Sequence, residues 1–306
     1  MDKKLSALPD GMLRIAQSLP SPAGVKAFYL LRRIYRAIGG ATGRLTKFRF
    51  GNIELAGPLN HPALFWRYLP KGFNQNYVLT AKETVRTKNG LIIDVGANIG
   101  DGVALLRSNG IDSPILAIEG ADAWFELLTS NTQGISDIFL EKYLLGDACV
   151  EEDMELLVKE GSSKLVKGGS GVKIATLDNI LSRYKDMPVA MLKTDTDGFD
   201  FKVLLGAKSL LKEQQPVLFI EVDEGLLRDQ GDSSAQLIDY ITECGYTWVA
   251  VWDNYGRWLE ARSIAQGISD LIDRHPGGPE TAYLDIAAFS EADQNLLRSI
   301  EKANLV

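Results

Sequence analysis

Short apolar runs alternate with segments of helical periodicity from about residue 81 onward. Continuous apolar runs are typical of buried parallel strands, and apolar residues three and four apart indicate helices. The predicted strands are Leu91–Val95, Pro114–Glu119, Ile138–Leu145, Val189–Thr194, Pro216–Val222, Tyr246–Trp252 and Tyr283–Phe289. The predicted helices are a segment ending near Asn109, Asp122–Asn131, Leu177–Arg183, Phe199–Leu211 and Ser234–Cys244. This alternation predicts an α/β fold, in which helices cover both faces of a doubly wound sheet of about seven mostly parallel strands.

Two segments depart from the alternation. Glu155–Val158 and Val172–Ala175 are expected to pair as a short hairpin around a loop, Gly161–Gly171, that is rich in Gly, Ser and Lys. Three aromatic residues flank a second predicted turn: Trp252, Tyr255 and Trp258. They fit either a β-hairpin with Trp252 in the core or an aromatic platform for a sugar face.

The N-terminal 80 residues have a different character, so we divide the chain into an α-rich extension, 1–80, and a main domain, 81–306. Between Gly11 and Ile53 there are eight basic residues and no acidic ones, which leaves −15 on the rest of a chain whose net charge is −7. Apolar residues recur at helical spacing between Val25 and Ile38. Such a helix either lies on an anionic membrane surface, through residues 25–49, or packs on the main domain with its basic face in water.

Composition narrows the function further. The chain has 306 residues, two Cys and two His, and its negative charge argues against nucleic-acid binding. The cysteines form no close pair, which argues against a disulfide framework or a structural zinc site. We find neither a signal-peptide pattern nor an apolar run long enough to span a membrane. The expected location is therefore the cytoplasm, with possible contact at the inner face of the membrane.

Candidate binding residues follow the first predicted strand. In α/β sheets ligands bind beyond the carboxyl ends of the strands. There the chain has Asp94, a turn containing Gly96, Asn98 and Gly100, and then a helix whose free N–H groups suit a carboxylate or phosphate. The glycine spacing matches neither a phosphate-binding P-loop nor the dinucleotide fingerprint.

The next two strand ends extend the candidate site. Glu119 closes the second strand, where a carboxylate can accept both hydroxyls of a ribose. Asp147 follows the third, where it is either an acceptor for an adenine amino group or a surface turn residue.

These motifs and several later ones together resemble the FkbM-like S-adenosylmethionine-dependent methyltransferases. The motifs that carry the resemblance are Asp94–Gly100, Glu119, Thr176-Leu177-Asp178, Leu192 to Asp200, Leu204 to Ala207 and Phe219-Ile220-Glu221. The resemblance covers roughly residues 85–225. Asp197-Gly198 stands where the family usually has Glu-Gly. The resemblance implies S-adenosylmethionine as cofactor and an O-methyltransferase whose acceptors are hydroxyls of sugars, polysaccharides or natural products.

A hydroxyl acceptor needs a base or a metal ion, and with two histidines in the chain carboxylates are the better candidates. In one mechanism Asp195 or Asp197 takes the hydroxyl proton. In the other Asp195, Asp197 and Asp223 bind Mg²⁺. Capping of the following helix is the structural alternative for Asp195 and Asp197. His275, in a loop rich in Pro and Gly, is a further candidate base.

We therefore expect transfer of a methyl group to a glycan hydroxyl, in the synthesis of a bacterial surface polysaccharide or glycolipid. One alternative is a methyltransferase of a natural product or nucleotide sugar. The other is an inactive protein of methyltransferase fold that binds nucleosides or serves as a scaffold.

Overall fold

The central feature of the fold is an eight-stranded sheet. The structure is a computed structural model that describes residues 30, 33, 34, 45–66, 74–159, 162–274 and 283–305. The sheet has the strand order β12-β11-β13-β10-β9-β3-β4-β5. Its strands are β3 (Leu91–Val95), β4 (Ile115–Ile118), β5 (Ile138–Glu141), β9 (Val189–Thr194), β10 (Val217–Val222), β11 (Tyr246–Asp253), β12 (Trp258–Ser263) and β13 (Leu284–Ser290).

The middle of the sheet is parallel and buried, as the apolar runs predict. Strands β5, β4, β3, β9 and β10 pair in parallel, whereas β13 runs antiparallel between β10 and β11. Every residue of β3 and β9 is buried. The expected mostly parallel α/β sheet is thus confirmed, with one strand more than the seven predicted. The extra strand, β12, forms the expected hairpin with β11.

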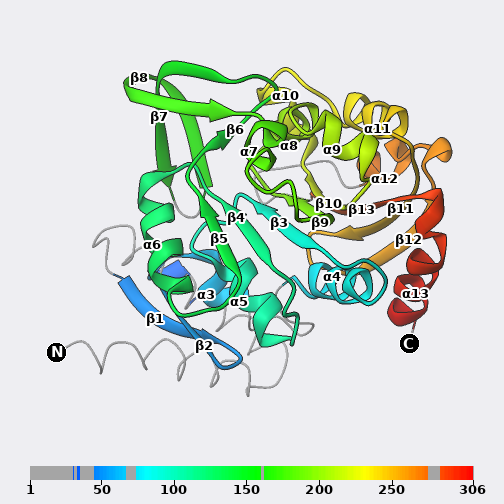
Figure 1. Cartoon of the computed structure of the whole chain (residues 1–306), viewed down its shortest axis with the longest axis horizontal. Helices are drawn as coiled ribbons and strands as arrows, with labels where there is room; N and C mark the ends of the chain where they lie inside the picture. The colour runs from blue at the N-terminus through cyan, green and yellow to red at the C-terminus, as the bar shows by residue number, and fades with distance from the viewer. Residues whose placement is uncertain are drawn as a thin grey trace.

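Helices cover both faces of the sheet (Figure 1). One hydrophobic cluster packs residues of α4, α5, α6 and α13 against one face, and a second cluster packs α7 to α12 against the other. The helices on the first face are α4 (Gln75–Thr87), α5 (Asp101–Ser108), α6 (Asp122–Thr132) and α13 (Gln294–Asn304). Those on the second are α7 (Leu177–Leu181), α8 (Asp200–Leu205), α9 (Lys208–Glu213), α10 (Glu224–Asp229), α11 (Ser234–Glu243) and α12 (Ser269–Arg274).

The described part of the N-terminal extension contains strands as well as helices, and the expected α-rich character of residues 1–80 stays a prediction. Strands β1 (Leu45–Phe50) and β2 (Ile53–Pro58) form an antiparallel hairpin, followed by the short helix α3 (Pro62–Trp66). The hairpin alternates exposed and buried residues along β1, so it buries one face against α5 and α6. Helix α4 runs across residue 80. The described residues before 81 thus share the first hydrophobic cluster with the sheet.

Two sequence predictions were wrong in detail. The run Ile138–Leu145 is divided: β5 joins the central sheet and β6 (Leu144–Leu145) joins a separate three-stranded sheet. The expected loop at residues 161–171 is largely strand, because β7 (Val150–Lys159) and β8 (Ser162–Ala175) form one long hairpin. Glycine and serine suggested a loop, but the ladder bonds of the hairpin override that preference.

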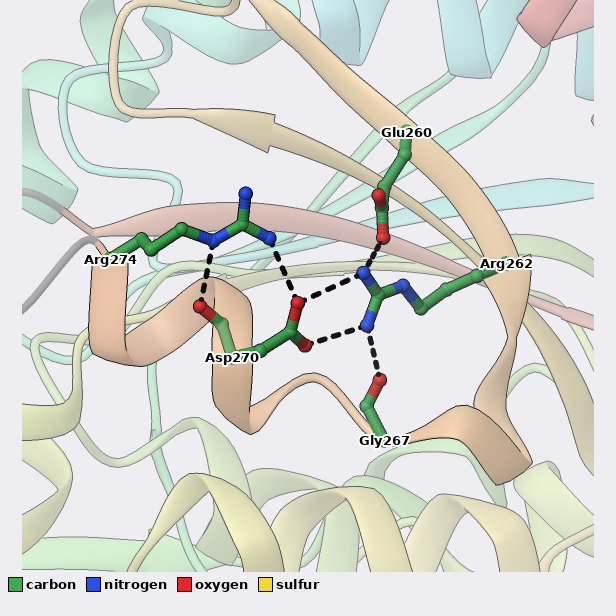
Figure 2. Close-up of polar contacts among 5 residues, drawn as sticks. All are labelled: Glu260, Arg262, Gly267, Asp270 and Arg274. Atoms are coloured by element: carbon green, nitrogen blue, oxygen red, sulfur yellow. Dashed lines mark hydrogen bonds and ion pairs between the residues drawn. The ribbon is translucent and has the colours of Figure 1, made fainter.

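A charged cluster at one end of the sheet holds α12 against β12 (Figure 2). Arg262 of β12 binds both carboxylate oxygens of Asp270 at 2.7 and 3.2 Å, the carbonyl of Gly267 at 3.0 Å, and Glu260. Arg274 binds the same carboxylate at 2.8 Å. The hydrogen bond from Arg262 and the other bonds lower the pKa of Asp270 to about 2, so the cluster stays charged throughout the neutral range.

None of the helices in the described ranges has the length and apolar character of a membrane span.

The predicted helix Phe199–Leu211 is broken into α8 and α9 at Gly206. A Cβ at Gly206 would lie 2.1 Å from the carbonyl oxygen of Gly146, so only glycine fits there. We predict that Gly206→Ala lowers the free energy of unfolding by about 2 kcal/mol, the usual cost of overpacking. The exposed Lys208→Ala should change it by less than about 0.5 kcal/mol. Urea unfolding of both variants tests this, and equal stabilities would contradict the steric argument.

Candidate functional site

Polar side chains from four neighbouring strands, and one from the residue after a fifth, lie on one face along the carboxyl edge of the parallel strands. Lys193 and Asp94 pair in the ladder, and Glu221 and Asp285 pair two residues nearer the edge. This set, which we call the polar row, runs across the sheet in the order Asp285, Glu221, Lys193, Asp94 and Glu119, from β13, β10, β9, β3 and the residue after β4. Side chains alternate between the two faces of a strand. The residues two positions further into each strand all belong to the first hydrophobic cluster: Ala287, Phe219, Met191, Ile92 and Ala117. The polar row therefore faces α4 and α5.

The strand order reverses between β3 and β9, which places the middle of the polar row at the switch point where α/β sheets bind ligands. The turn after β3 lies there. Gly96, Asn98 and Gly100 all have positive φ, at 76°, 49° and 85°. A Cβ at Gly96 would lie 2.0 Å from the carbonyl oxygen of Asp195. The turn after β3 and the turn after β9 thus meet backbone to backbone, as only glycine permits.

Glu119 holds the turn after β3 in place. Its two carboxylate oxygens accept hydrogen bonds from the backbone N–H of Asn98 at 2.9 Å and of Ala121 at 2.8 Å. Burial raises the pKa of Glu119 to about 6, against the lowering effect of these bonds. Because a carboxylate has about four acceptor positions, two remain for a ribose diol. Its predicted cofactor-binding role stays a prediction.

His61, which the sequence did not place in the site, lies beside this turn. Its Nδ1 accepts from the backbone N–H of Ala63 at 3.2 Å, so its Nε2 is the donor to Asn98 Oδ1 at 3.0 Å. The ring packs edge-on against Trp124. Burial lowers the pKa of His61 to about 4, which outweighs the raising effect of Asn98. The imidazole is therefore neutral and orients Asn98.

Lys193 is the one basic residue of the polar row. Its Nζ lies 2.9 Å from Asp94 Oδ1 and 3.4 Å from Asp195 Oδ2. The ring of Tyr77 from α4 lies 5.9 Å from the same nitrogen. The sequence motifs predict no role for Lys193. A lysine inside an otherwise apolar strand does indicate a buried ion pair, because buried lysines are nearly always paired.

Asp195 lies next to Glu221, and the two carboxyl groups share a hydrogen bond. Burial and the charge of Asp195 raise the pKa of Glu221 well above its usual value. The pKa of Asp195 is lowered, because the charge of Lys193 and the bond from Glu221 outweigh its burial. Glu221 therefore carries the proton and Asp195 is the ionised partner. With 40% of its side chain exposed, Asp195 can reach a ligand.

The far end of the polar row is also acidic. Asp285 is 8% exposed and accepts a hydrogen bond from the side chain of Asn76, on α4, at 2.6 Å. Burial raises the pKa of Asp285 to about 7, and Asn76 lowers it by less. Burial likewise raises the pKa of Asp101, the first residue of α5, to about 7. Protonation of such groups limits the negative charge that the polar row carries near neutral pH.

The two predicted catalytic carboxylates lie in different surroundings. Asp195 lies with Lys193 and Glu221, whereas the charge of Asp197 acts on Glu119, at the cofactor end. Asp197 has a φ of 52° in the tight turn before α8. The N-cap residue of α8 is Phe199, whose side chain makes no cap bond, and the capping alternative for Asp195 and Asp197 stays a prediction. The structure thus favours Asp195 as the group that meets an acceptor.

Asp223 is a helix cap and not the metal ligand that the sequence predicted. Its carboxylate accepts from the backbone N–H groups of Gly225 at 2.8 Å and Leu226 at 3.1 Å, at the start of α10. Across the ranges that the structure describes, no three His, Cys, Asp or Glu side chains are grouped so as to hold a metal ion. The predicted Mg²⁺ site of Asp195, Asp197 and Asp223 is not supported.

The remaining candidates are Asp147, His275 and the aromatic residues of the β11–β12 hairpin. Asp147 occupies an exposed turn after β6, so its adenine-binding role stays a prediction. His275 lies outside the described residues, directly after α12. Trp252 is fully buried and packs edge-on against Trp258, which confirms the hairpin and leaves no platform containing Trp252.

Buried carboxyl groups and a glycine turn thus lie at the switch point of a parallel sheet, where α/β proteins bind their ligands. The sequence profile of the methyltransferase FkbM domain matches residues 94–247, half of the chain. The protein belongs to this methyltransferase family. No curated protein matches the chain.

Solved structures of methyltransferases are similar to the chain at low sequence identity and at TM-scores below 0.5. A methyltransferase FkbM from Methylobacillus flagellatus KT is 17% identical, with a TM-score of 0.39, over 65% of this chain and 43% of that one. The chain thus spans less than half the length of that protein. A human methyltransferase 10 domain containing protein is 12% identical, with a TM-score of 0.44, over 86% and 97%. An O-methyltransferase from Bacillus cereus, in complex with SAH, is 11% identical, with a TM-score of 0.41, over 95% and 100%.

The raised pKa of Asp285 gives a pH prediction. A carboxyl whose folded pKa lies above its unfolded value of 3.8 stabilises the protein at low pH, and this contribution is lost as the pH rises from about 4 through about 7. Asn resembles the protonated acid and can still accept from Asn76. We therefore predict that Asp285→Asn, compared with the unchanged protein, gains about 2.5 kcal/mol of stability between pH 5 and pH 8, because about two of the roughly 3 units of the pKa shift take effect in that range.

Denaturant unfolding at the two pH values measures this difference. The control is Asp239→Asn, on the exposed surface of α11, which should leave the pH dependence unchanged. A difference between Asp285→Asn and the unchanged protein that is the same at both pH values would show that Asp285 is ionised throughout.

Proposed function

We propose that the protein is an S-adenosylmethionine-dependent O-methyltransferase whose acceptor is a sugar hydroxyl. The observation that carries this proposal is the position of Asp195. Its ionised, partly exposed carboxylate lies across from the cofactor turn, because the turn after β9 contacts Gly96 directly. Methyl transfer from a sulfonium needs mainly the alignment of donor and acceptor, together with a base for a hydroxyl nucleophile.

The residues of the cofactor end fit S-adenosylmethionine. Glu119 offers two free acceptor positions to the ribose, and the positive-φ turn from Gly96 to Gly100 brings the backbone close to a ligand. The cofactor supplies an electrophilic methyl group with a positive charge on its sulfur. The polar row complements the positive charge of the sulfur, because each of its residues except Lys193 carries a carboxyl group.

Asp195 takes the proton of the acceptor hydroxyl in this proposal. Glu221 holds the shared proton, so it does not compete with Asp195 as a base. The sugar acceptor is part of the proposal and rests on the family resemblance. It agrees with a site that presents carboxyl and amide groups, which hydrogen-bond hydroxyls readily. A natural-product or nucleotide-sugar acceptor is the second candidate, which turnover on free soluble sugars would favour.

We predict that the protein binds S-adenosylhomocysteine in calorimetry, and that Asp195→Asn still binds it but transfers methyl groups 10²–10⁴-fold more slowly, roughly the contribution of a general base. Transfer of labelled methyl from S-adenosylmethionine to glycolipids, polysaccharides and free sugars measures the rate. Asp197→Asn is the matched comparison. It should slow turnover less than Asp195→Asn does, because its charge acts on Glu119 at the cofactor end. Loss of that charge lowers the pKa of Glu119 and so favours the ionised carboxylate that accepts from the cofactor.

Absence of S-adenosylhomocysteine binding would contradict the methyltransferase assignment and favour a scaffold role. Full activity of Asp195→Asn would remove Asp195 as the base.

A role in bacterial surface polysaccharide or glycolipid synthesis, in the cytoplasm at the inner face of the membrane, completes the proposal. Lipid-linked acceptors would be met at that surface. Leu30, Arg33 and Ile34 are helical and exposed, and the two apolar side chains are 59% and 44% exposed one helical turn apart. Exposed apolar residues beside basic ones are typical of helices that lie on anionic lipid.

We predict that the protein floats with liposomes that contain anionic lipid at low salt, and that Leu30→Asp with Ile34→Asp abolishes flotation. Leu305→Asp is the control, because Leu305 is 71% exposed at the opposite end of the chain. Flotation that is unchanged in the double variant, or absent in the unchanged protein, would contradict a membrane role for residues 25–49.

A further inference from the structure

Lys193 occupies the middle of the polar row, directly opposite Asp94. The two residues pair in the parallel ladder between β9 and β3, so their side chains emerge from adjacent strands on the same face of the sheet. Lys193 is 6% exposed and Asp94 is 1% exposed. A buried ammonium is costly unless it is paired and hydrogen-bonded, so its partners determine where it lies.

The ammonium bridges two turns. Of its two carboxylate partners, Asp94 belongs to β3 and precedes the cofactor turn, at 2.9 Å, whereas Asp195 follows β9, at 3.4 Å. The ring of Tyr77 covers a third side. An ammonium has three donors, so it can serve both carboxylates at once. Lys193 is thus the one side chain of the polar row that contacts both the cofactor turn's strand and the turn that carries Asp195.

The charges around Lys193 explain why Asp195 needs a cation. Carboxyl groups flank Asp195: Glu221 and Asp285 on one side and Asp94 on the other. The raised pKa values of Glu221 and Asp285 reduce their charge, and Lys193 is the cation that pairs with Asp94 and Asp195. Burial alone lowers the pKa of Lys193, but the charges of Asp94 and Asp195 raise it well above its usual value. The ammonium is therefore charged at neutral pH.

We propose that Lys193 is a positioning residue: by binding Asp94 and Asp195 together, it holds the Asp195 carboxylate where an acceptor hydroxyl meets the cofactor. The effect of Lys193 on methyl transfer rests on the proposed function. The position of the Asp195 carboxylate can be tested without any acceptor. Removal of the ammonium leaves Asp195 with the hydrogen bond from Glu221 but without its ion pair, so we expect its side chain to turn outward.

The direct test is a pair of crystal structures, of the unchanged protein and of Lys193→Met, each with and without S-adenosylhomocysteine. Met has nearly the length of Lys and no charge. We expect the Asp195 carboxylate to move by more than about 1 Å in Lys193→Met, a distance that already costs catalysis heavily. Lys193→Arg keeps the positive charge and should keep the carboxylate in place. An Asp195 carboxylate that is unmoved in Lys193→Met would overturn the inference.

A purely structural pair between Lys193 and Asp94 is the alternative. It predicts that Lys193→Met lowers stability and leaves Asp195 in place. If Lys193→Met does not fold, Lys193→Met with Asp94→Asn removes one charge of each sign and takes its place in the same comparison. The displacement of Asp195 is expected there too, because Asp94→Asn supplies no cation.

Kinetics give a second readout. With an acceptor from the transfer assay, Lys193→Met should lower kcat at least 10-fold with less than a 3-fold change in the KM of S-adenosylmethionine. In an Asp195→Asn background the same substitution should change kcat less than 2-fold, since residues that act as a unit are not additive. An equal loss in both backgrounds would contradict the inference.

The two proposals fail differently. If the unchanged protein does not bind S-adenosylhomocysteine while Asp195 still depends on Lys193, the proposed function fails and the positioning role stands.

Discussion

The buried ammonium of Lys193 is the interaction on which the candidate site depends. It joins two carboxylates from neighbouring parallel strands, in a row that otherwise consists of carboxyl groups. Parallel strands bring such residues together because their carboxyl ends meet at one edge of a sheet. That arrangement suits a cationic cofactor, but it concentrates negative charge. The chain limits the charge in two ways, by a paired cation in the middle and by carboxyls that hold their protons, Glu221 and Asp285 among them.

The polar row also separates two tasks along one edge. At the end of β4, Glu119 is bound to the backbone of the glycine turn and is positioned through Asn98 by the neutral ring of His61. At the end of β9 and β10, Asp195 and Glu221 share a proton. Asp197 is only two residues from Asp195, yet it acts on the first group. The reason is the tight turn, which directs successive carboxylates to different sides of the switch point.

The sequence predicted the α/β class and most of the strands because buried parallel strands are continuous apolar runs. It also located the glycine turn, Glu119 and Asp195, since these lie at strand ends. The sequence did not predict the contacts between segments that lie far apart in the chain. Lys193 and Asp94 are 99 residues apart, and His61 and Asn98 are 37 apart. Nor does a carboxylate show in sequence whether it caps a helix, as Asp223 does, or faces a site. The break at Gly206 depends on a carbonyl 60 positions earlier in the chain.

His61 has a consequence for where the working unit begins. The hairpin of β1 and β2 packs on α5 and α6, Asn131 on α6 bonds the backbone of both Ala56 and Ile99, and His61 bonds Asn98. Ile99 and Asn98 are part of the glycine turn itself. A protein trimmed to residues 94–247, the segment that matches the family, would keep β4, β5, β9 and β10 whole, yet its cofactor turn would lose the supports that come from outside that segment. Family boundaries drawn from sequence are, for this chain, narrower than the smallest piece that can hold the turn in shape.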